Sequence, residues 1–373
     1  MKTVNGHEII QIFENWSPKK YACMPNDPIG LAVGTLNKSV SKVLVTLDVT
    51  HAVIDEAIEK GCELIIAHHP PIFMKLSNLR TDNPQGQLYE KLLKNDIAVY
   101  AAHTNLDVAP GGVNDLLADA LGLVESRILE STYIEPMMKL AVIIPATHAA
   151  EMRGVLAKAG AGKIGLYANC SFTLSGTGRF RVLEGADPYL GEVGETEVAD
   201  EDKIEVVFTA SMKNKILKAM LNAHPYEEPA YDLWTLDVDV NEQGLGRIGK
   251  LEEPMTLKQF AEHVKVKLDV PALRVVGNLE TMVQKVAVVG GDGNKYIRTA
   301  KFAGADVFVT GDIGFHMAQD AEMNGLNIVD PGHHVEKVMI KGVAEKMGAL
   351  CAEKTLPVEF IQSEVHTEPF KFM

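Results

Sequence analysis

Short apolar runs alternate with amphipathic stretches through the first third of the chain. Val43–Leu47, Leu64–Ala67 and Ile97–Ala102 are apolar and rich in small or β-branched side chains, so each predicts a buried strand. Val53–Lys60, between the first two, has apolar residues at helical spacing and stops at Gly61, a typical residue for a helix end. Strand–helix–strand units of this length predict a largely parallel sheet with right-handed crossovers.

A stretch near the C-terminal end follows the same pattern. When Lys42 is placed on Lys285, strand falls on strand and turn glycine on turn glycine, without a gap, as far as His69 on Asp312. Few identities match, so the agreement lies in the pattern. It predicts that the chain contains a duplicated α/β half, with His69 and Asp312 at equivalent strand ends.

The middle of the chain has a different pattern. Lys139–Ile144 and Lys203–Thr209 alternate in the manner of half-buried strands. His148–Ala159 and Lys213–Ala223 have the spacing of amphipathic helices. This order of elements predicts a small α+β domain of ferredoxin-like type.

Because this segment lies between the two matching halves, we interpret it as an insertion. We expect residues 1–127 and 241–373 to form one discontinuous α/β domain, with residues 128–240 as the inserted domain. Within the insert, the glycine-rich segment Ser175–Gly178 is expected to be a turn, and the acidic segment of residues 195–202 a solvated loop.

Composition and charge restrict the classes of function. The chain has 373 residues, and its 36 Lys and Arg against 50 Asp and Glu leave a formal charge of −14. A negative charge of this size argues against a nucleic-acid backbone as the main partner. The four cysteines form no CxxC pair, and neither a signal peptide nor a membrane span is visible, so we expect a reducing, cytoplasmic location and no thiolate zinc site.

Three histidine-containing motifs each follow a predicted strand. In open α/β sheets ligands bind beyond the carboxyl ends of the strands, so these positions are candidates for chemistry. The motifs are, in chain order, His68-His69, His103 with Asp107, and His333-His334 with Glu336.

Each motif has a structural explanation beside the chemical one. Adjacent histidines can be a hydrogen-bonded surface pair, Asp107 precedes a Pro-Gly-Gly turn, and Glu336 can favour the positive end of a helix. Together, however, the three motifs supply imidazoles and carboxylates, a ligand set that suits Zn, Fe, Mn or Ni. So many ligands exceed what one tetrahedral ion takes and suit two ions that share a bridging carboxylate.

Three further segments allow two interpretations each. Asp312 and His316 lie at the repeat-equivalent strand end. There they can support the metal ligands or move protons near a metal, or Asp312 can cap a helix. Gly290–Asn294 is either an anion-binding loop or a tight turn near the metal pocket. In the insert, the prolines of His224–Pro229 favour a turn over a second ligand site.

These blocks, in this order, resemble the NIF-three-like family of dinuclear-metal proteins, which are often labelled GTP cyclohydrolase I type 2 homologues. Asp27–Gly34 resembles the N-terminal signature of that family, and Thr310-Gly311-Asp312 resembles another of its blocks. The resemblance runs nearly end to end. It implies an α/β fold of two similar halves, with an insert that resembles the PII/CutA-like domain of the longer bacterial members.

The resemblance also implies a site for two divalent metal ions, with zinc expected first and Fe, Mn or Ni as alternatives. Many relatives place the final glutamate one residue further from the histidine than this chain does, so either His333 or His334 can pair with it. We prefer His333 because it directly follows the glycine, as in the family block. The implied ligands are His68, His69, Asp107, His333 and Glu336.

The family label implies opening of the GTP ring, for which His103, Asp312 and His316 are candidate catalytic residues. We therefore expect a metal-dependent hydrolase acting on a nucleotide or a related small molecule. The alternative is a non-enzymatic metal-handling or regulatory assembly. The resemblance further implies a homo-oligomer, expected to be a hexameric ring whose opening the insert covers. We expect no membrane or nucleic-acid partner.

Overall fold

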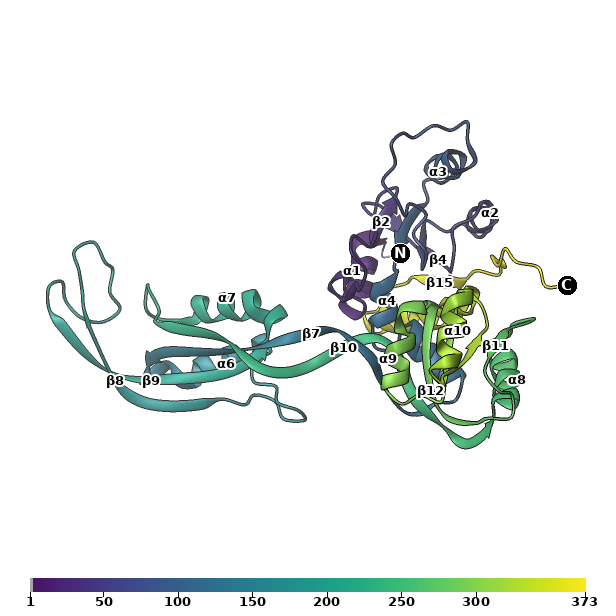
Figure 1. Cartoon of the computed structure of the whole chain (residues 1–373). Coiled ribbons are helices and arrows are strands. Elements are labelled where there is room, and N and C mark those ends of the chain that lie inside the picture. Colours follow the sequence, from purple (N-terminus) through teal and green to yellow (C-terminus); the bar gives the residue numbers. More distant parts are fainter. Residues whose placement is uncertain (1–2) are drawn as a thin grey trace. The chain divides into compact units, whose positions relative to one another are not determined.

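The computed structural model describes residues 3–373, apart from the side chains of residues 239–241. The chain forms two compact units (Figure 1). The first combines the segment up to Tyr133 with the segment from Gln243 onward, and the second is Ile134–Glu242. Two long strands, β7 and β10, carry the chain from one unit into the other. Among residues 3–373, no helix is both long and apolar enough to cross a membrane.

The N-terminal half of the first unit contains a five-stranded sheet of order β15-β4-β5-β6-β2. Strands β15, β4, β5 and β6 are parallel, and β2 pairs antiparallel with β6 at the edge. The elements of this half are β1 (Val4–Asn5), α1 (Gly6–Trp16), η1 (Lys19–Tyr21), β2 (Gly30–Val33), β3 (Ser39–Val40), β4 (Lys42–Thr46), α2 (His51–Lys60), β5 (Leu64–Ala67), α3 (Pro84–Lys94), β6 (Ala98–Ala101), α4 (Thr104–Val108) and α5 (Val113–Ala120).

The C-terminal half has the corresponding strand order β11-β14-β13-β12, with β12, β13 and β14 parallel and β11 antiparallel at the edge. Strand β10 pairs antiparallel with β12 on its other side. The elements are β10 (Tyr231–Thr256), α8 (Leu257–Lys267), β11 (Arg274–Val276), β12 (Met282–Asp292), η4 (Asn294–Tyr296), α9 (Ile297–Phe302), β13 (Val307–Gly311), α10 (Phe315–Met323), β14 (Asn327–Asp330), η5 (His333–Lys337), α11 (Val338–Glu353) and β15 (Glu359–Gln362).

The duplication predicted from the sequence is confirmed by the strand register. Val43 of β4 pairs with Leu64 of β5, and their aligned counterparts Val286 and Val307 pair in β12 and β13. Even a side-chain detail repeats. The Glu63 carboxylate accepts hydrogen bonds from the backbone amides of Ser41 and Lys42 at the start of β4. The aligned Asp306 carboxylate accepts from the corresponding amides of Gln284 and Lys285 in β12. The two halves are therefore copies of one α/β pattern, with little sequence identity between them.

One hydrophobic core joins the two sheets. Val43 and Val45 face this shared core, together with Val286 and Val288 of the second sheet and apolar residues of α1, α5, α8 and α11. The intervening Leu44 faces the opposite way, toward α2 and α3. Strands that are buried on both faces need apolar residues at every position, which is why they appear in the sequence as continuous apolar runs.

The second unit has the strand order β10-β7-β9-β8 and the element order β–α–β–β–α–β, which is the ferredoxin-like arrangement expected from the sequence. Helices α6 and α7 share one core with β7 and β9. The elements are β7 (Val124–Pro145), η2 (Ala146–His148), α6 (Ala149–Ala159), β8 (Phe172–Arg181), β9 (Thr196–Thr209), η3 (Ala210–Met212), α7 (Lys213–Ala223) and the first part of β10.

Two local predictions in the insert were wrong. Ser175–Gly178 is not a turn but lies inside β8, and most of the acidic segment of residues 195–202 is not a loop but the start of β9, to which β8 pairs. Gly176 has open space around it, whereas packing requires a glycine at position 178. A Cβ on Gly178 would lie 1.7 Å from the carboxylate of Glu201, which is buried in this sheet and accepts a hydrogen bond from Tyr226.

Candidate metal centre

His68 and His69 follow the carboxyl end of β5, whose four residues are all buried. Their backbone amides continue the hydrogen bonding of β5 to the β4 side, at Thr46 and Leu47. The Nδ1 of His68 donates to the carbonyl oxygen of Ala102 at 2.8 Å, which leaves Nε2 as an acceptor. Because the side chain of His68 is buried, this acceptor faces the protein interior and not solvent.

The sequence suggested that Asp107 lies in a loop, but the residue belongs to the short helix α4. It is buried, and its Oδ1 lies 3.5 Å from Nε2 of His68. Its backbone oxygen accepts a hydrogen bond from Nδ2 of Asn114, whose Oδ1 accepts one from the amide of Gly290. Asn114 therefore ties Asp107 to the second half of the unit.

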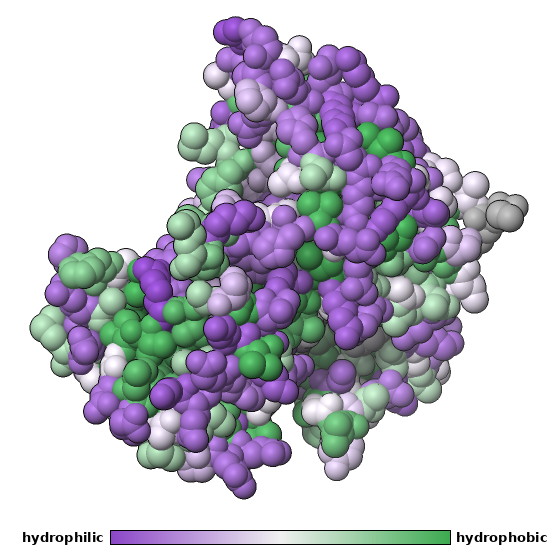
Figure 2. Space-filling model, turned by 90° about the vertical axis from the view of Figure 1, so that its right-hand side faces the viewer, coloured by the Kyte–Doolittle hydropathy of each residue, from purple (hydrophilic) through white to green (hydrophobic). Residues whose placement is uncertain are grey.

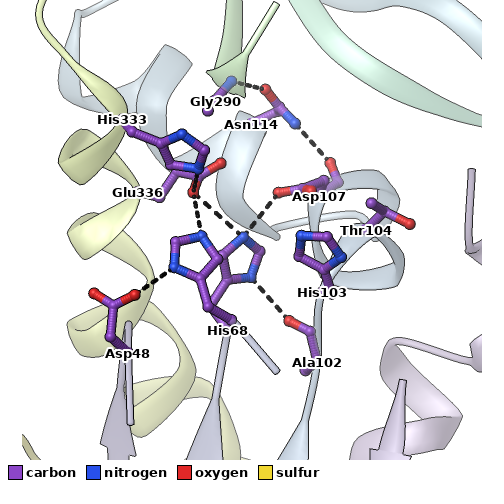
Figure 3. Close-up of polar contacts among 12 residues, drawn as sticks. Asp48, His68, Ala102, His103, Thr104, Asp107, Asn114, Gly290, His333 and Glu336 are labelled. Atoms are coloured by element: carbon purple, nitrogen blue, oxygen red, sulfur yellow. Dashed lines mark hydrogen bonds and ion pairs between the residues drawn. The ribbon is translucent and has the colours of Figure 1, made fainter. Parts of the chain in front are cut away.

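Glu336 and His333 come from the second half, in the 3₁₀ turn η5. A 3₁₀ helix has three residues per turn, so side chains three positions apart lie directly above one another. Nε2 of His333 is accordingly 3.3 Å from Oε2 of Glu336. The same oxygen lies 3.1 Å from Nε2 of His69 and 3.6 Å from Nε2 of His68. This explains how the shorter spacing in this chain still brings histidine and glutamate together (Figure 3).

His334, the alternative partner of Glu336, faces elsewhere. Its Nε2 is 3.3 Å from the Thr367 hydroxyl, and its ring centroid is 4.6 Å from that of His366, with the two rings tilted by 36°. The structure thus places His333, and not its neighbour, beside the glutamate. The helix whose positive end Glu336 was expected to favour, α11, begins two residues later, at Val338.

Two glycines make room for the centre. A Cβ on Gly291 would lie 2.7 Å from Oε1 of Glu336 and 3.1 Å from Nε2 of His333, and the residue has a left-handed φ of +60°. A Cβ on Gly290 would also lie 3.0 Å from Glu336 Oε1. Gly290 and Gly291 belong to the end of β12, and Asn294 begins η4. The first part of the glycine segment therefore forms a wall of the centre.

The charges of the cluster shift the protonation of its members. Burial alone would lower the pKa of His69, but hydrogen bonds to Asp48 and Glu336 raise it to about 10. The hydrogen bond to Glu336 also raises the pKa of His333, to about 9. Burial raises the pKa of Asp107 to about 6. Burial would do the same to Glu336, but the charge of His68 and the hydrogen bond from His333 hold its pKa well below the usual range.

The residues fit a bound cation. The ligand atoms of His68, His69 and Glu336 all lie within 4.8 Å of one another, close enough to share one ion. His68 Nε2 and Asp107 Oδ1 are both buried and have no hydrogen-bond partner among the described residues. Buried polar atoms are normally satisfied, and a cation bound between this nitrogen and this oxygen would satisfy both. Asp107 and His333 each contact one member of the group of three.

Carboxylates hold the histidine rings from outside. Asp48 accepts a hydrogen bond from Nδ1 of His69 at 2.6 Å, and Asp312 accepts one from Nδ1 of His333 at 2.7 Å. Support of a metal ligand is one of the roles that the sequence predicted for Asp312, and the structure confirms this contact with His333. Sequence reasoning missed Asp48. Asp48 follows strand β4 just as the histidines follow β5, so the strand-end rule that singled out the histidines also applies to it.

The candidate catalytic residues differ in their distance from the cluster. His103 lies beside it, with its ring centroid 5.5 Å from that of His68 and 6.1 Å from that of His69. His316 is exposed at the start of α10, where its recorded contacts are with Gln319 and Phe315. Asp312 does not cap that helix, whose N-cap is Gly314.

The His224 motif of the insert has structural contacts. Nε2 of His224 donates to the carbonyl oxygen of Ile143 at 2.9 Å, and its Nδ1 accepts from the amide of Tyr226. Both ring nitrogens are therefore engaged with the backbone, which agrees with the interpretation as a turn.

The sequence pattern of the Duf34/NIF3 (NGG1p interacting factor 3) family matches residues 4–369. The chain belongs to the Duf34/NIF3 family. The GTP cyclohydrolase 1 type 2 homolog of Bacillus subtilis (strain 168) is 55% identical to it over 372 residues, and that of Listeria innocua serovar 6a is 46% identical over 373 residues. Both alignments cover 100% of this chain and of the relative. The resemblance drawn from the motifs is thereby confirmed.

Solved structures confirm the NIF3-like fold. A Bacillus cereus protein related to NIF3 matches with a TM-score of 0.94 at 55% identity, and a Staphylococcus aureus protein with 0.83 at 32%, each over 100% of both chains. CutA of Xylella fastidiosa matches 28% of this chain and 86% of its own, with a TM-score of 0.21 and 17% identity.

Proposed function

We propose that this protein holds two divalent metal ions at the centre formed by His68, His69, Asp107, His333 and Glu336. The observation that carries the proposal is the buried pair His68 Nε2 and Asp107 Oδ1, which lie 3.5 Å apart and have no hydrogen-bond partner among the described residues. Imidazole and carboxylate ligands without thiolates suit zinc in an open site, with Fe, Mn or Ni as alternatives.

The activity we infer is metal-dependent hydrolysis of a small molecule. Divalent ions at such a centre supply the Lewis acidity that activates water and polarises the bond to be cleaved. We assign the movement of protons to His103. Its Nδ1–H is held by Asp27 at 2.7 Å, so Nε2 is left as an acceptor beside the rings of His68 and His69.

Asp27 is suited to hold this histidine. Its side chain is buried and accepts further hydrogen bonds from the amide and the hydroxyl of Thr104. Burial alone would raise the pKa of Asp27, but the hydrogen bonds from His103 and Thr104 lower it. The ionised carboxylate then fixes the tautomer and the direction of the His103 ring. Asp312 acts through His333, and exposed His316 is the weakest of the three candidates.

The substrate class comes from the relatives. Proteins over 50% identical across the whole chain carry the name GTP cyclohydrolase 1 type 2 homolog, so nucleotides are the first class to examine. Hydrolysis of a purine nucleotide ring requires an activated water and a group that transfers protons, and His103 beside the centre supplies the second requirement.

A non-enzymatic role in metal handling or regulation is the second candidate. It is supported by the ferredoxin-like insert, a domain type that can bind effectors or join subunits without chemistry. In either case we propose a cytoplasmic homo-oligomer, a hexameric ring whose opening the insert covers.

A turnover measurement with a matched variant separates the two roles. Wild-type protein loaded with Zn²⁺, Mn²⁺ or Fe²⁺ is incubated with a panel of purine and pyrimidine nucleotides, and product formation is followed chromatographically. The enzyme proposal expects turnover that His103→Gln lowers at least 100-fold while the metal content stays unchanged. The exposed His316→Gln is the control. If no nucleotide turns over with any metal, or if His103→Gln is fully active, the assignment of this chemistry is wrong.

A further inference from the structure

A cavity of about 1100 Å³ opens beside the proposed metal centre, within the first unit. One wall carries His69 and His333, which we assign to the metal ions. A second wall carries Leu273 and Arg274, at the start of β11, and a third is the C-terminal segment Thr367–Phe372. Pockets for small organic ligands have this order of size, so a nucleotide-sized molecule fits.

The carboxylates of this cavity already have partners. Asp48 accepts from His69 and Thr367, and Asp312 accepts from His333. Asp330 is buried and accepts from the amides of Ile313 and Gly332 as well as from Arg274. Glu368, which also lines the cavity, accepts from the amide of Phe370. Each of these carboxylates thus has a donor within the protein itself, and none of them calls for a cationic ligand.

The guanidinium of Arg274 has more N–H donors than its pair with Asp330 uses. Its Nη2 pairs with Asp330, while the side chain as a whole remains 66% exposed at the cavity wall. A guanidinium has five N–H donors in a planar fork, so most of them are not used by this pair. Such a fork matches a carboxylate, phosphate or sulfonate group. Asp330 fixes the arginine in place because it is itself held by two backbone amides.

Another part of the cavity lining is apolar and aromatic. Phe370 and Phe372 line it and yet are 69% and 50% exposed, and Pro70 and Pro71 follow the metal-binding histidines on the neighbouring wall. Figure 2 shows the molecule from the side on which the C-terminal segment lies, where apolar residues reach the surface between hydrophilic ones. Exposed phenylalanines on a cavity wall gain most from a flat, apolar partner.

We propose that this cavity binds a small organic anion with a flat apolar body, its anionic group on Arg274 and its body against Phe370 and Phe372. The inference rests on the proposed function, because the wall with His69 and His333 would present the bound molecule to the metal ions. It adds what the metal ligands do not specify, which is the chemical class of the molecule and the residues that select it.

The test uses 8-anilinonaphthalene-1-sulfonate as probe, since it combines a sulfonate with aromatic rings and becomes fluorescent when its rings leave water. The full chain is titrated after removal of metal. Arg274→Gln is expected to weaken binding roughly tenfold, the effect of losing one charged hydrogen-bonding group. The double change Phe370→Ala with Phe372→Ala is expected to weaken it by a similar factor. Arg298→Gln and Phe302→Ala, both exposed and outside the cavity, are the matched controls.

Two comparisons keep the result specific. N-phenyl-1-naphthylamine has the same rings without the sulfonate. Its affinity is expected to be unchanged by Arg274→Gln and to fall with the phenylalanine changes. Arg274→Lys keeps a cation over Asp330, so its affinity for the sulfonate is expected to lie between wild type and Arg274→Gln.

The proposal is overturned if the cavity variants bind the sulfonate probe as tightly as the controls do. It is also overturned if Arg274→Gln weakens binding of the neutral probe as much as binding of the sulfonate probe. Deletion of residues 369–373 is expected to weaken binding as the double phenylalanine change does. Tighter binding after this deletion would show that the chain's own end occupies the cavity, and would also overturn the proposal. Because the titration is done without metal, it stands or fails independently of metal binding and of turnover.

Discussion

At the scale of single residues, the centre is built from histidines whose Nδ1 atoms are hydrogen-bonded to groups outside the centre. Asp48 holds His69, Asp312 holds His333, and the Ala102 carbonyl holds His68, in each case through Nδ1. Each contact keeps the hydrogen on Nδ1 and leaves Nε2 for the centre. Such outer contacts orient metal-binding imidazoles and raise their basicity.

Asp48→Asn tests one of these outer contacts without changing a proposed ligand. The amide cannot hold His69 as the carboxylate does, so the affinity for Zn²⁺ is expected to fall by about 10–100-fold. Competition titrations against a chelator of known affinity measure the change. Asp119→Asn, on the exposed face of α5, is the control and should match wild type. Wild-type affinity in Asp48→Asn would contradict the role given to this carboxylate.

Protons and metal ions compete for the same ring nitrogens. An unperturbed imidazole would confine this competition to pH values below about 6.5. Because the pKa is about 10 for His69 and about 9 for His333 in the absence of metal, the affinity for Zn²⁺ is expected to keep rising well above neutral pH.

The stability of the metal-stripped protein is expected to fall as pH rises, which is opposite to the trend of the zinc affinity. Its two histidines hold protons more tightly when folded than when unfolded, so their contribution to stability is full below about pH 6.5 and is lost as pH rises through 9 to 10. Thermal melts with and without Zn²⁺ at several pH values measure both trends. A zinc affinity that does not change between about pH 7 and pH 9 would contradict these protonation states.

At the scale of elements, the carboxyl ends of the strands determine where the ligands lie. The first half supplies His68 and His69 after β5 and Asp107 after β6, and the second supplies His333 and Glu336 after β14. The end of β12 must then approach closely enough that only glycine fits at position 291.

Gly291→Ala tests this close approach. The new Cβ would press on Glu336 and His333, so we expect the metal content to fall below half of the wild-type value. Gly61→Ala is a matched control, because Gly61 has a similar φ of +68° but open space around it. Both changes should cost about 1–2 kcal/mol of stability for the left-handed backbone, but only the first should affect the metal. Full metal content in Gly291→Ala, measured by elemental analysis, would contradict the model of a tight wall.

The elements were largely predictable, and the exceptions have physical causes. Buried parallel strands such as Leu64–Ala67 were visible because every position is apolar, and α2 because Gly61 ends it. The 3₁₀ turn at His333 was not, since nothing local distinguishes it from the start of an α-helix. The acidic start of β9 was hidden because its pairing with β8 outweighs its local preference for a loop. Asn114 acts through Gly290, which is far away in the chain, and a single sequence does not reveal this contact.

At the scale of the whole molecule, the duplication explains why one centre needs both halves. Neither half carries the complete set of proposed ligands, so a bound metal would link two copies of one α/β pattern that share a core. The insert contributes none of the proposed ligands and forms a unit with its own core.

A deletion tests whether metal binding is independent of the insert. Strands β7 and β10 are neighbours in their sheet, so residues 134–242 can be replaced by an Asn-Gly turn between them. The shortened protein is expected to bind metal with the wild-type affinity, because all proposed ligands lie outside the deleted segment. Circular dichroism provides the folding control. A folded variant without metal affinity would contradict the independence of the two units.

The central claim is a two-metal centre, and metal counting tests it most directly. Protein purified without added metal is examined by elemental analysis as wild type, Asp107→Asn, Glu336→Gln and the control Asp119→Asn. We predict about two divalent ions per chain in wild type and control, and less than half of that in the other two variants with unchanged circular dichroism. A wild-type protein that neither contains nor takes up divalent ions, or ligand variants that keep the full complement, would contradict the account.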